Sequence, residues 1–221
     1  MTSPAFPYLL VIFDLDGVLV DSDACHSIAY EETWARLAVR GAPTYAELAG
    51  RRTRDVIEEQ IARQGIRAEL DASVRFKQDR ARHHLETALI LFPDVPQALP
   101  RFARVARLAV GTGASRETAR IMLQRLGALA RFEAMVAAED VAFGKPAPDV
   151  YLRVLELCGV AAAQTLIVED SNAGATAALR AGADLALVRS GKLAPEGEPR
   201  PHIVGAFADL TALADALGLP R

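Results

Sequence analysis

Two aspartates separated by one residue stand directly after an apolar run near the start of the chain. The stretch reads FDLDGVLVDS, with Asp14 and Asp16 following the run 9–13. A carboxylate in this position can act as a nucleophile and form an aspartyl-phosphate. A second carboxyl two residues on can reach the oxygen that leaves, and Gly17 permits the tight turn that this requires. Because Asp-x-Asp-Gly alone is more often a plain turn than a catalytic site, the pair needs support from elsewhere in the chain.

Further polar residues follow other apolar runs. Thr112 follows LAVG, Lys145 lies in the loop GKPAPD, and Glu169 and Asp170 follow TLIV. Since ligands bind at the carboxyl ends of strands in an open parallel sheet, we expect these side chains to share one rim with the two aspartates. Clustered carboxylates repel one another unless a cation lies between them, and an all-oxygen set with open positions suits Mg²⁺. The lysine and the threonine would hold the non-bridging oxygens of a phosphoryl group.

Short apolar runs alternate with amphipathic stretches along most of the chain, which predicts an α/β fold with a largely parallel, Rossmann-like sheet and helices on both faces. We expect strands at 9–13, 108–111, 134–137, 165–168 and 185–188, and a short extra strand at 203–204. Helices are expected at 115–126, 149–158 and 171–181, and each is followed by a glycine. The Pro- and Gly-rich stretch 194–201 is expected to be a surface loop.

The stretch 21–91 breaks this alternation, because it shows helical periodicity and offers no strand candidate. A crossover between parallel strands usually needs one helix, and this stretch is far longer. We therefore predict an inserted all-α cap domain at 21–91 and a catalytic core formed by 1–20 and 92–221. The hinges are expected near 20–23 and 92–94, where Pro93 stiffens the returning linker.

The composition narrows the class of protein. Among 221 residues 51% are hydrophobic and the net charge is −3, so no basic face for nucleic acid is expected. Cys25 and Cys158 are the two cysteines and are far apart in sequence, which favours a reducing compartment over a disulfide framework. No apolar run reaches membrane-spanning length, and the first residues lack the pattern of a signal peptide. We expect a cytoplasmic protein with no membrane partner.

Four segments together resemble the motifs of the haloacid dehalogenase superfamily: DLDGVLVDS, Thr112 after LAVG, GKPAPDVY and VEDSNAG, in this order. The helical insert after the first strand is similar to the cap of phosphoglycolate phosphatases and β-phosphoglucomutase. The resemblance implies that Asp14 is the nucleophile and a Mg²⁺ ligand. It implies that Asp16 protonates the leaving group, then activates water, and binds the metal through its backbone carbonyl.

The same resemblance assigns the remaining motif residues. It implies that Thr112 and Lys145 hold the phosphoryl group, that Asp170 binds Mg²⁺ directly, and that Glu169 does so directly or through water. Dehalogenase relatives lack a carboxylate at the position of Asp16, so a phosphorylated substrate is favoured over a haloacid. Gly113, next to Thr112, is counted among the residues expected to bind substrate.

In the inserted stretch the signals are weaker. His26 lies one turn into the first expected helix, where the family often has a histidine facing the substrate; a structural role is equally open. Arg51 lies in a segment, GRRT, that matches the family's specificity loop and could bind a carboxylate or a distal phosphate. A solvated helix face is at least as good an explanation for the neighbouring arginines.

These observations predict a Mg²⁺-dependent phosphatase of a small phosphate monoester, working as a monomer or weak homodimer. A β-phosphoglucomutase-type mutase is the main alternative, although Ala49 stands where that enzyme has a lysine. A non-catalytic binding protein on the same fold is less favoured, since every chemical position is filled. A dinucleotide site at Gly111-Thr112-Gly113 is disfavoured because Arg116 stands where the third glycine belongs.

Overall fold

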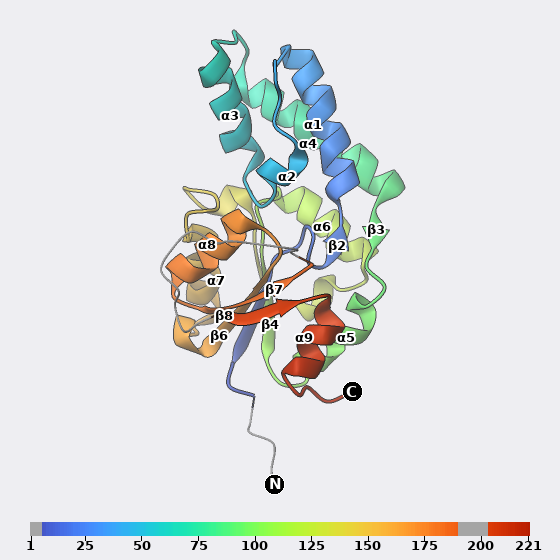
Figure 1. Ribbon diagram of the computed structural model, residues 1–221, viewed down its shortest axis with the longest axis vertical. Coiled ribbons are helices and arrows are strands. Elements are labelled where there is room, and N and C mark those ends of the chain that lie inside the picture. The colour runs from blue at the N-terminus through green and yellow to red at the C-terminus, as the bar shows by residue number, and fades with distance from the viewer. Residues whose placement is uncertain (1–5, 190–202) are drawn as a thin grey trace.

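A parallel sheet forms the centre of the molecule (Figure 1). The computed structural model describes residues 6–189 and 203–221, so the first five residues and the loop expected at 194–201 lie outside the described residues. Within them the six-stranded sheet has the order β5-β4-β1-β6-β7-β8, with parallel neighbours throughout. The strands are β1 (Leu10–Phe13), β4 (Arg107–Gly111), β5 (Ala134–Val136), β6 (Thr165–Glu169), β7 (Asp184–Val188) and β8 (Ile203–Phe207). The predicted strands are confirmed to within a residue or two, except β8, which continues three residues further.

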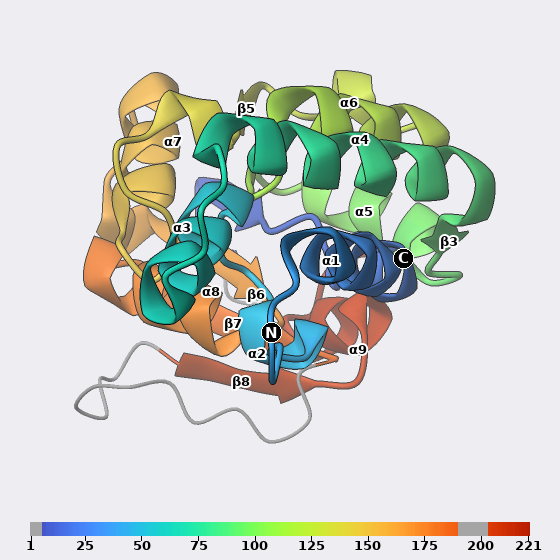
Figure 2. The ribbon, with the colours of Figure 1, turned by 90° about the horizontal axis from the view of Figure 1, so that it is seen from above.

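Strand β1, in the middle of the sheet, is buried on both sides, as its uninterrupted apolar sequence requires. Successive side chains of a strand point to opposite faces. Val11 and Phe13 accordingly pack in one hydrophobic cluster, while Leu10 and Ile12 pack in another. Seen from above in Figure 2, α7 (Asp149–Cys158) and α8 (Asn172–Ala181) cover one face of the sheet, and α5 (Val95–Ala103) and α9 (Leu210–Ala216) cover the other. The predicted α/β core with helices on both faces is confirmed.

Among the core helices, α6 (Arg116–Arg125), α7 and α8 begin and end close to the predicted positions, whereas α5 and α9 were not predicted. Ser115 caps α6 and Ser171 caps α8, since each side chain accepts a hydrogen bond from a backbone N–H of the first turn. Gly159 ends α7 in the left-handed conformation. The bounds of these helices are α5 (Val95–Ala103), α6 (Arg116–Arg125), α7 (Asp149–Cys158), α8 (Asn172–Ala181) and α9 (Leu210–Ala216).

Four helices lie above the carboxyl ends of the strands and form the upper part of Figure 1. They are α1 (Asp23–Leu37), α2 (Tyr45–Leu48), α3 (Thr53–Gln64) and α4 (Leu70–Ala88). They enclose a hydrophobic cluster of their own, which consists of Tyr30, Trp34, Leu37, Leu48, Val56, Ile57 and Val74. The short α2 was not predicted, since four residues are too few to show a period. We call these helices and their connections the cap. In the described part of the chain no helix is both long and apolar enough to cross a membrane.

The two connections between the cap and the core pair with each other. Val20–Asp21 (β2) and Ile90–Leu91 (β3) form a two-stranded antiparallel ribbon. The prediction that 21–91 contains no strand is therefore wrong at both of its ends. The pairing joins residues about 70 positions apart, and two-residue strands carry no local periodicity, so this ribbon leaves no signal in the sequence. We propose that the ribbon is the boundary between the inserted cap and the core.

Candidate active site

A buried lysine joins two of the expected carboxylates. Asp14 directly follows β1, and its backbone N–H donates to the carbonyl of Val168 in the neighbouring β6 at 3.0 Å. Lys145, from the loop before α7, donates from Nζ to Asp14 Oδ1 at 2.8 Å and to Glu169 Oε1 at 2.6 Å. Burial lowers the pKa of Lys145, but the two carboxylates outweigh it and raise that pKa above its ordinary value. Three residues predicted from separate segments therefore meet in one ion-pair cluster.

Glu169 is fully buried and held from both oxygens. Its Oε1 also accepts from the Tyr151 hydroxyl at 2.5 Å, and its Oε2 accepts from the Ser171 hydroxyl at 3.0 Å. A Cβ at Gly174 would lie 1.7 Å from Oε1, so the carboxylate packs against the first turn of α8 at a place that only glycine permits. Tyr151 was not predicted as a site residue. Its signal was its place in GKPAPDVY, one helical turn after the lysine loop.

Asp14, Glu169 and Asp170 form an acidic cluster whose ligand oxygens all lie within 4.8 Å of one another. Burial, with the charges of Glu169 and Asp16, raises the pKa of Asp14 to about 7 despite the opposing effect of Lys145. Burial and the charges of Glu169 and Asp14 also raise the pKa of Asp170 well above its usual range. The single positive charge of Lys145 thus does not neutralise the negative charge of these carboxylates. The donor set is made of oxygen alone, which fits a hard cation such as Mg²⁺.

Asp16 faces a different set of partners. Its Oδ1 accepts from the Ser22 hydroxyl at 2.5 Å and lies 3.0 Å from His26 Nε2. Burial raises the pKa of Asp16, but His26, Ser22 and the charge of Lys77 outweigh it and lower that pKa to about 2. The structure thus places His26 beside the second aspartate. Its ring contacts Asp16 and stacks on Tyr45 at a centroid distance of 5.6 Å.

Lys77 of α4 completes this network and was missed in the sequence. Its Nζ lies 2.9 Å from His26 Nδ1 and 4.3 Å from the centroid of the Tyr30 ring. The arrangement fits a neutral histidine that accepts from Lys77 at Nδ1 and donates to Asp16 from Nε2. Burial lowers the pKa of Lys77 to about 8, although Asp16 opposes the shift. The spacing along α4 was a signal for this position. Lys77 lies four residues from the buried Ser73 and Ala81, so it belongs to the side of the helix that faces the core.

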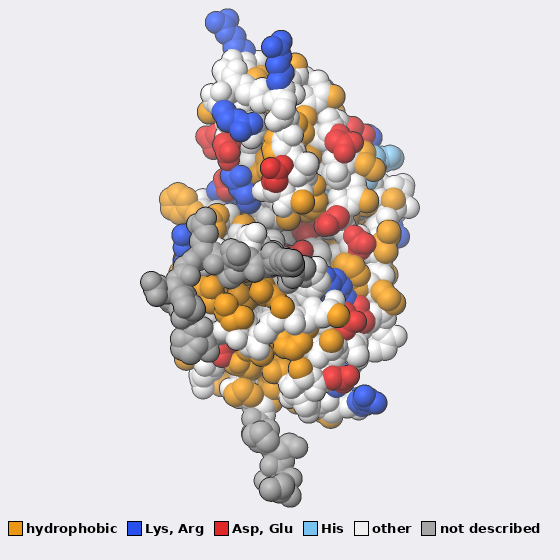
Figure 3. All heavy atoms as spheres, in the orientation of Figure 1, with side chains coloured by type: hydrophobic (Ala, Val, Ile, Leu, Met, Phe, Trp, Pro, Cys, Tyr) orange, Lys and Arg blue, Asp and Glu red, His pale blue; other side chains and the backbone are white. Residues whose placement is uncertain are grey.

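Two of the three remaining predicted residues line a small cavity between the cap and the core, and Thr112 does not. Gly113 and Arg51 line it together with both aspartates. Arg51 donates from Nη2 to Glu59 Oε2 at 2.6 Å. Thr112, at the end of β4, is buried and its Oγ1 accepts from the N–H of Ala114 at 3.0 Å. The space open to water in this cavity is about 30 Å³. On the face shown in Figure 3 acidic and basic side chains are interspersed.

This constellation at the carboxyl ends of a parallel sheet, under a helical insert, defines the class of protein. The chain belongs to the haloacid dehalogenase-like hydrolase family, whose model matches residues 11–188. It is 32% identical to the fructose-1-phosphate phosphatase YqaB of Escherichia coli over 194 residues, which cover 82% of this chain and 97% of that protein. It is 31% identical to a phosphoglycolate phosphatase of Cupriavidus necator, with 98% of this chain and 93% of that protein covered.

The fold is also similar to that of a solved structure. CbbY from Rhodobacter sphaeroides, crystallised in complex with phosphate, superposes with a TM-score of 0.80. The match covers 96% of this chain and 100% of that one at 24% sequence identity, so it supports the shared fold. The family resemblance that the four sequence motifs indicated is confirmed.

Proposed function

We propose that this protein is a Mg²⁺-dependent phosphatase that hydrolyses a small phosphate monoester through a phosphoryl group carried on Asp14. One observation carries the proposal. The buried Lys145 contacts Asp14 and Glu169 within an acidic cluster, while Asp16 faces a separate network of Ser22 and His26. Two carboxylates one residue apart thus have environments suited to attack and to proton transfer.

The residues of the cluster fit the metal. Asp14, Glu169 and Asp170 would hold Mg²⁺, with the backbone carbonyl of Asp16 as a further ligand. The ion would neutralise the charge that gathers where a phosphate approaches carboxylates. Asp14 would attack phosphorus, and Thr112 and Lys145 would hold the phosphoryl oxygens.

Asp16 would transfer the protons. Its lowered pKa keeps it ionised before substrate binds, which is the state needed to take a proton from the hydrolytic water. Protonation of the leaving oxygen needs the other state. An incoming phosphate dianion favours that state, because negative charge close to a carboxylate raises its pKa.

The named relatives support the substrate class. One is a fructose-1-phosphate phosphatase and another a phosphoglycolate phosphatase, and both names describe small phosphorylated metabolites. We also propose a cytoplasmic location, which the two buried free cysteines support. Our proposal for the oligomeric state remains a monomer or weak homodimer.

A phosphate-release screen tests the function. Purified protein would be incubated with sugar phosphates, 2-phosphoglycolate and nucleotides, with Mg²⁺ and with excess chelator. We expect release of inorganic phosphate from at least one small ester, and only with Mg²⁺. Conversion of a sugar phosphate to its positional isomer without free phosphate would instead show a mutase, and inertness toward the whole panel would support a binding protein.

A further inference from the structure

Arg52, at the start of α3, ties the cap to the core. Its Nε and Nη2 donate to the two carboxylate oxygens of Asp55 at 2.9 and 2.7 Å. Its Nη1 donates to the carbonyl oxygen of Val141, in the core, at 3.0 Å. The side chain of Arg52 is 13% exposed. Because the two bonds to Asp55 fix the plane of the guanidinium, the third bond has a defined direction.

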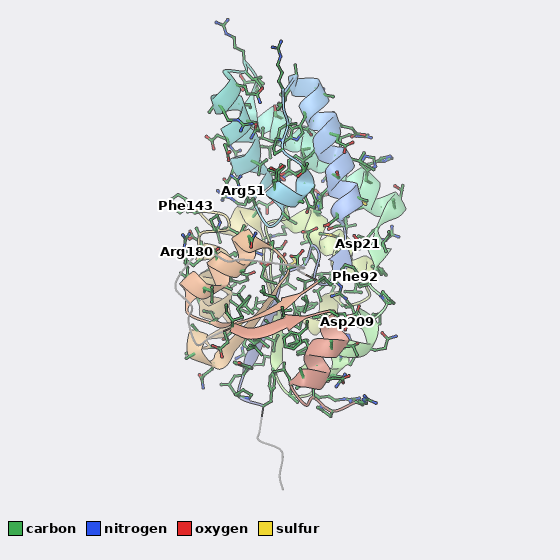
Figure 4. The ribbon with its side chains drawn as sticks, viewed as in Figure 1. Asp21, Arg51, Phe92, Phe143, Arg180 and Asp209 are labelled. Carbon is green, nitrogen blue, oxygen red and sulfur yellow. The ribbon has the colours of Figure 1, made fainter. Side chains whose placement is uncertain are left out.

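The core partner of Arg52 is the loop that carries Lys145. Val141 stands four residues before this lysine, and Gly144 directly precedes it. A Cβ added at Gly144 would lie 2.5 Å from Cγ of Arg52 and 2.8 Å from its Nε, so the loop backbone and the arginine pack in direct contact. Figure 4 labels Arg51 and Phe143, one on each of the two loops that meet here.

Within the cap, Arg52 belongs to the segment that covers the proposed phosphoryl site. Arg51 and Thr53, on either side of Arg52, both line the cavity that contains Asp14 and Asp16. Arg52 thus stands between two cavity-lining residues on one side and the lysine loop on the other. No other arginine of this segment does so among the described contacts: Arg51 pairs with Glu59 and Arg54 with Asp71, both within the cap.

We propose that Arg52 is a positioning residue, which holds the cap segment over the phosphoryl site and fixes the Lys145 loop when the cap is closed. The bond to Val141 joins the cap to the core, so it is made only in the closed arrangement. Its free energy therefore adds to closure rather than to the stability of either part. Asp55 keeps the guanidinium in the orientation that this bond needs.

Hydrogen exchange measured by mass spectrometry tests the proposal without reference to catalysis. Exchange would be measured without ligand and with Mg²⁺ and inorganic phosphate, which should favour the closed arrangement. Under at least the second condition Arg52→Ala should speed amide exchange in residues 141–145, while exchange in the sheet strands stays as in the unaltered protein. Arg54→Ala is the matched control, since it removes a guanidinium two residues away whose partner lies within the cap. It should leave the exchange of 141–145 unchanged. Equal exchange in this loop for Arg52→Ala and the unaltered protein would overturn the proposal.

A double-mutant cycle gives a second test. Gly144 does not have a positive φ, so alanine is tolerated there by the backbone and acts through its contact with Arg52. Gly144→Ala should displace Arg52 and reproduce the fast exchange of Arg52→Ala. In the Arg52→Ala background the same substitution should add little, because the Cγ and Nε that it meets are gone. The third close atom, Asp55 Oδ2 at 2.8 Å, then lacks its hydrogen bonds to Arg52 and can turn away. Additive effects of the two changes would contradict a shared contact.

The kinetic consequence rests on the proposed phosphatase function. Arg52→Ala should lower kcat/KM about tenfold, the scale of one charge-assisted hydrogen bond, with Arg54→Ala close to the unaltered protein. A larger effect on KM than on kcat is expected, since substrate binding and closure are coupled. If the unaltered protein hydrolyses nothing, the proposed function fails while the exchange experiment still decides the role of Arg52.

Discussion

Asp14 and Asp16 stand one residue apart and have opposite electrostatic surroundings. Burial and neighbouring carboxylates raise the pKa of Asp14 to about 7, while His26, Ser22 and Lys77 outweigh burial and lower the pKa of Asp16 to about 2. The two aspartates thus become chemically distinct groups, because the chain leaves β1 after Phe13 and turns at Gly17, so that Asp14 meets Lys145 while Asp16 meets Ser22 and His26.

The division of roles predicts a burst for the Asp16→Asn variant. The nitrophenolate of p-nitrophenyl phosphate leaves without a proton, so the first step should survive the loss of the acid. The second step should stall, because the base that activates water is missing. Rapid-mixing absorbance should show release of about one nitrophenolate per enzyme, followed by little turnover. Steady turnover at the rate of the unaltered protein would refute the acid/base role of Asp16.

Lys77 should show a conflict between stability and activity. The pKa of Lys77 in the folded protein is about 8, below the ordinary value of 10.5. Below pH 8 the buried side chain is charged, and this charge lowers the unfolding free energy. The shift corresponds to about 3 kcal/mol at most, and the buried Nδ1 of His26, left without its donor, would offset part of the gain. Lys77→Met should therefore not lower the unfolding free energy at pH 7. It should lower the rate of phosphate release, because Lys77 holds His26, which contacts Asp16.

The sign of the pH effect checks this explanation. Between pH 8 and 10.5 the unfolded chain holds the Lys77 proton and the folded protein does not, so stability relative to Lys77→Met should rise with pH in this range. Urea unfolding of both proteins at pH 7 and pH 9.5 measures the difference. A constant difference across the two values would rule out the buried ammonium as its cause.

At the scale of elements, Gly17 determines how the turn after β1 meets the acidic cluster of Asp14, Glu169 and Asp170. Its φ is +76°, and a Cβ there would lie 1.9 Å from Asp170 Oδ2. Gly17→Ala should cost about 1–2 kcal/mol in backbone strain and displace the carboxylate, which weakens Mg²⁺ binding. Gly65→Ala is the matched control, because Gly65 has a φ of +61° and nothing within 4 Å.

The two variants separate strain from contact. Both should lose stability in thermal unfolding, but only Gly17→Ala should require more Mg²⁺ for half-maximal phosphate release. An equal Mg²⁺ requirement for Gly17→Ala and Gly65→Ala would show that the turn does not shape the metal site.

The elements differ in how much the sequence reveals of them. β1 and β6 are apolar runs buried on both faces, so their sequence and their structure carry the same information. The motifs at the ends of β1 and β6 and the GKPAPD loop before α7 likewise predicted that Asp14, Glu169 and Lys145 would meet. The β2–β3 ribbon and the contact of Lys77 with His26 depend on residues that only the folded chain brings together, about 70 and 51 positions apart. Such long-range contacts have no local pattern to predict them.

For the whole molecule, the small cavity predicts a change of shape. The space open to water in it, about 30 Å³, holds roughly two water molecules, so we expect a phosphate ester to enter when the cap moves away from the core. We expect the β2–β3 ribbon to be the pivot of this movement, because it contains both connections between the cap and the core.

Small-angle scattering tests this motion. Adding Mg²⁺ with beryllium fluoride, which mimics a phosphoryl group on a carboxylate, should shift the population toward the closed arrangement and reduce the radius of gyration. Arg52→Ala should need more of the analogue for the same change. Identical scattering with and without the analogue would argue against an open state of the free protein.

The central claim is that phosphorus is transferred to Asp14. A rapid-quench experiment tests this claim directly. The enzyme would be mixed with Mg²⁺ and a substrate that it hydrolyses and quenched in acid within milliseconds, and its peptides would be sequenced by mass spectrometry. We predict one added phosphoryl group on the peptide 9–20, located at Asp14, that disappears as inorganic phosphate is released and is absent in Asp14→Asn, which should be inactive. Undiminished phosphate release by Asp14→Asn, or a phosphoryl group on another residue, would contradict the account.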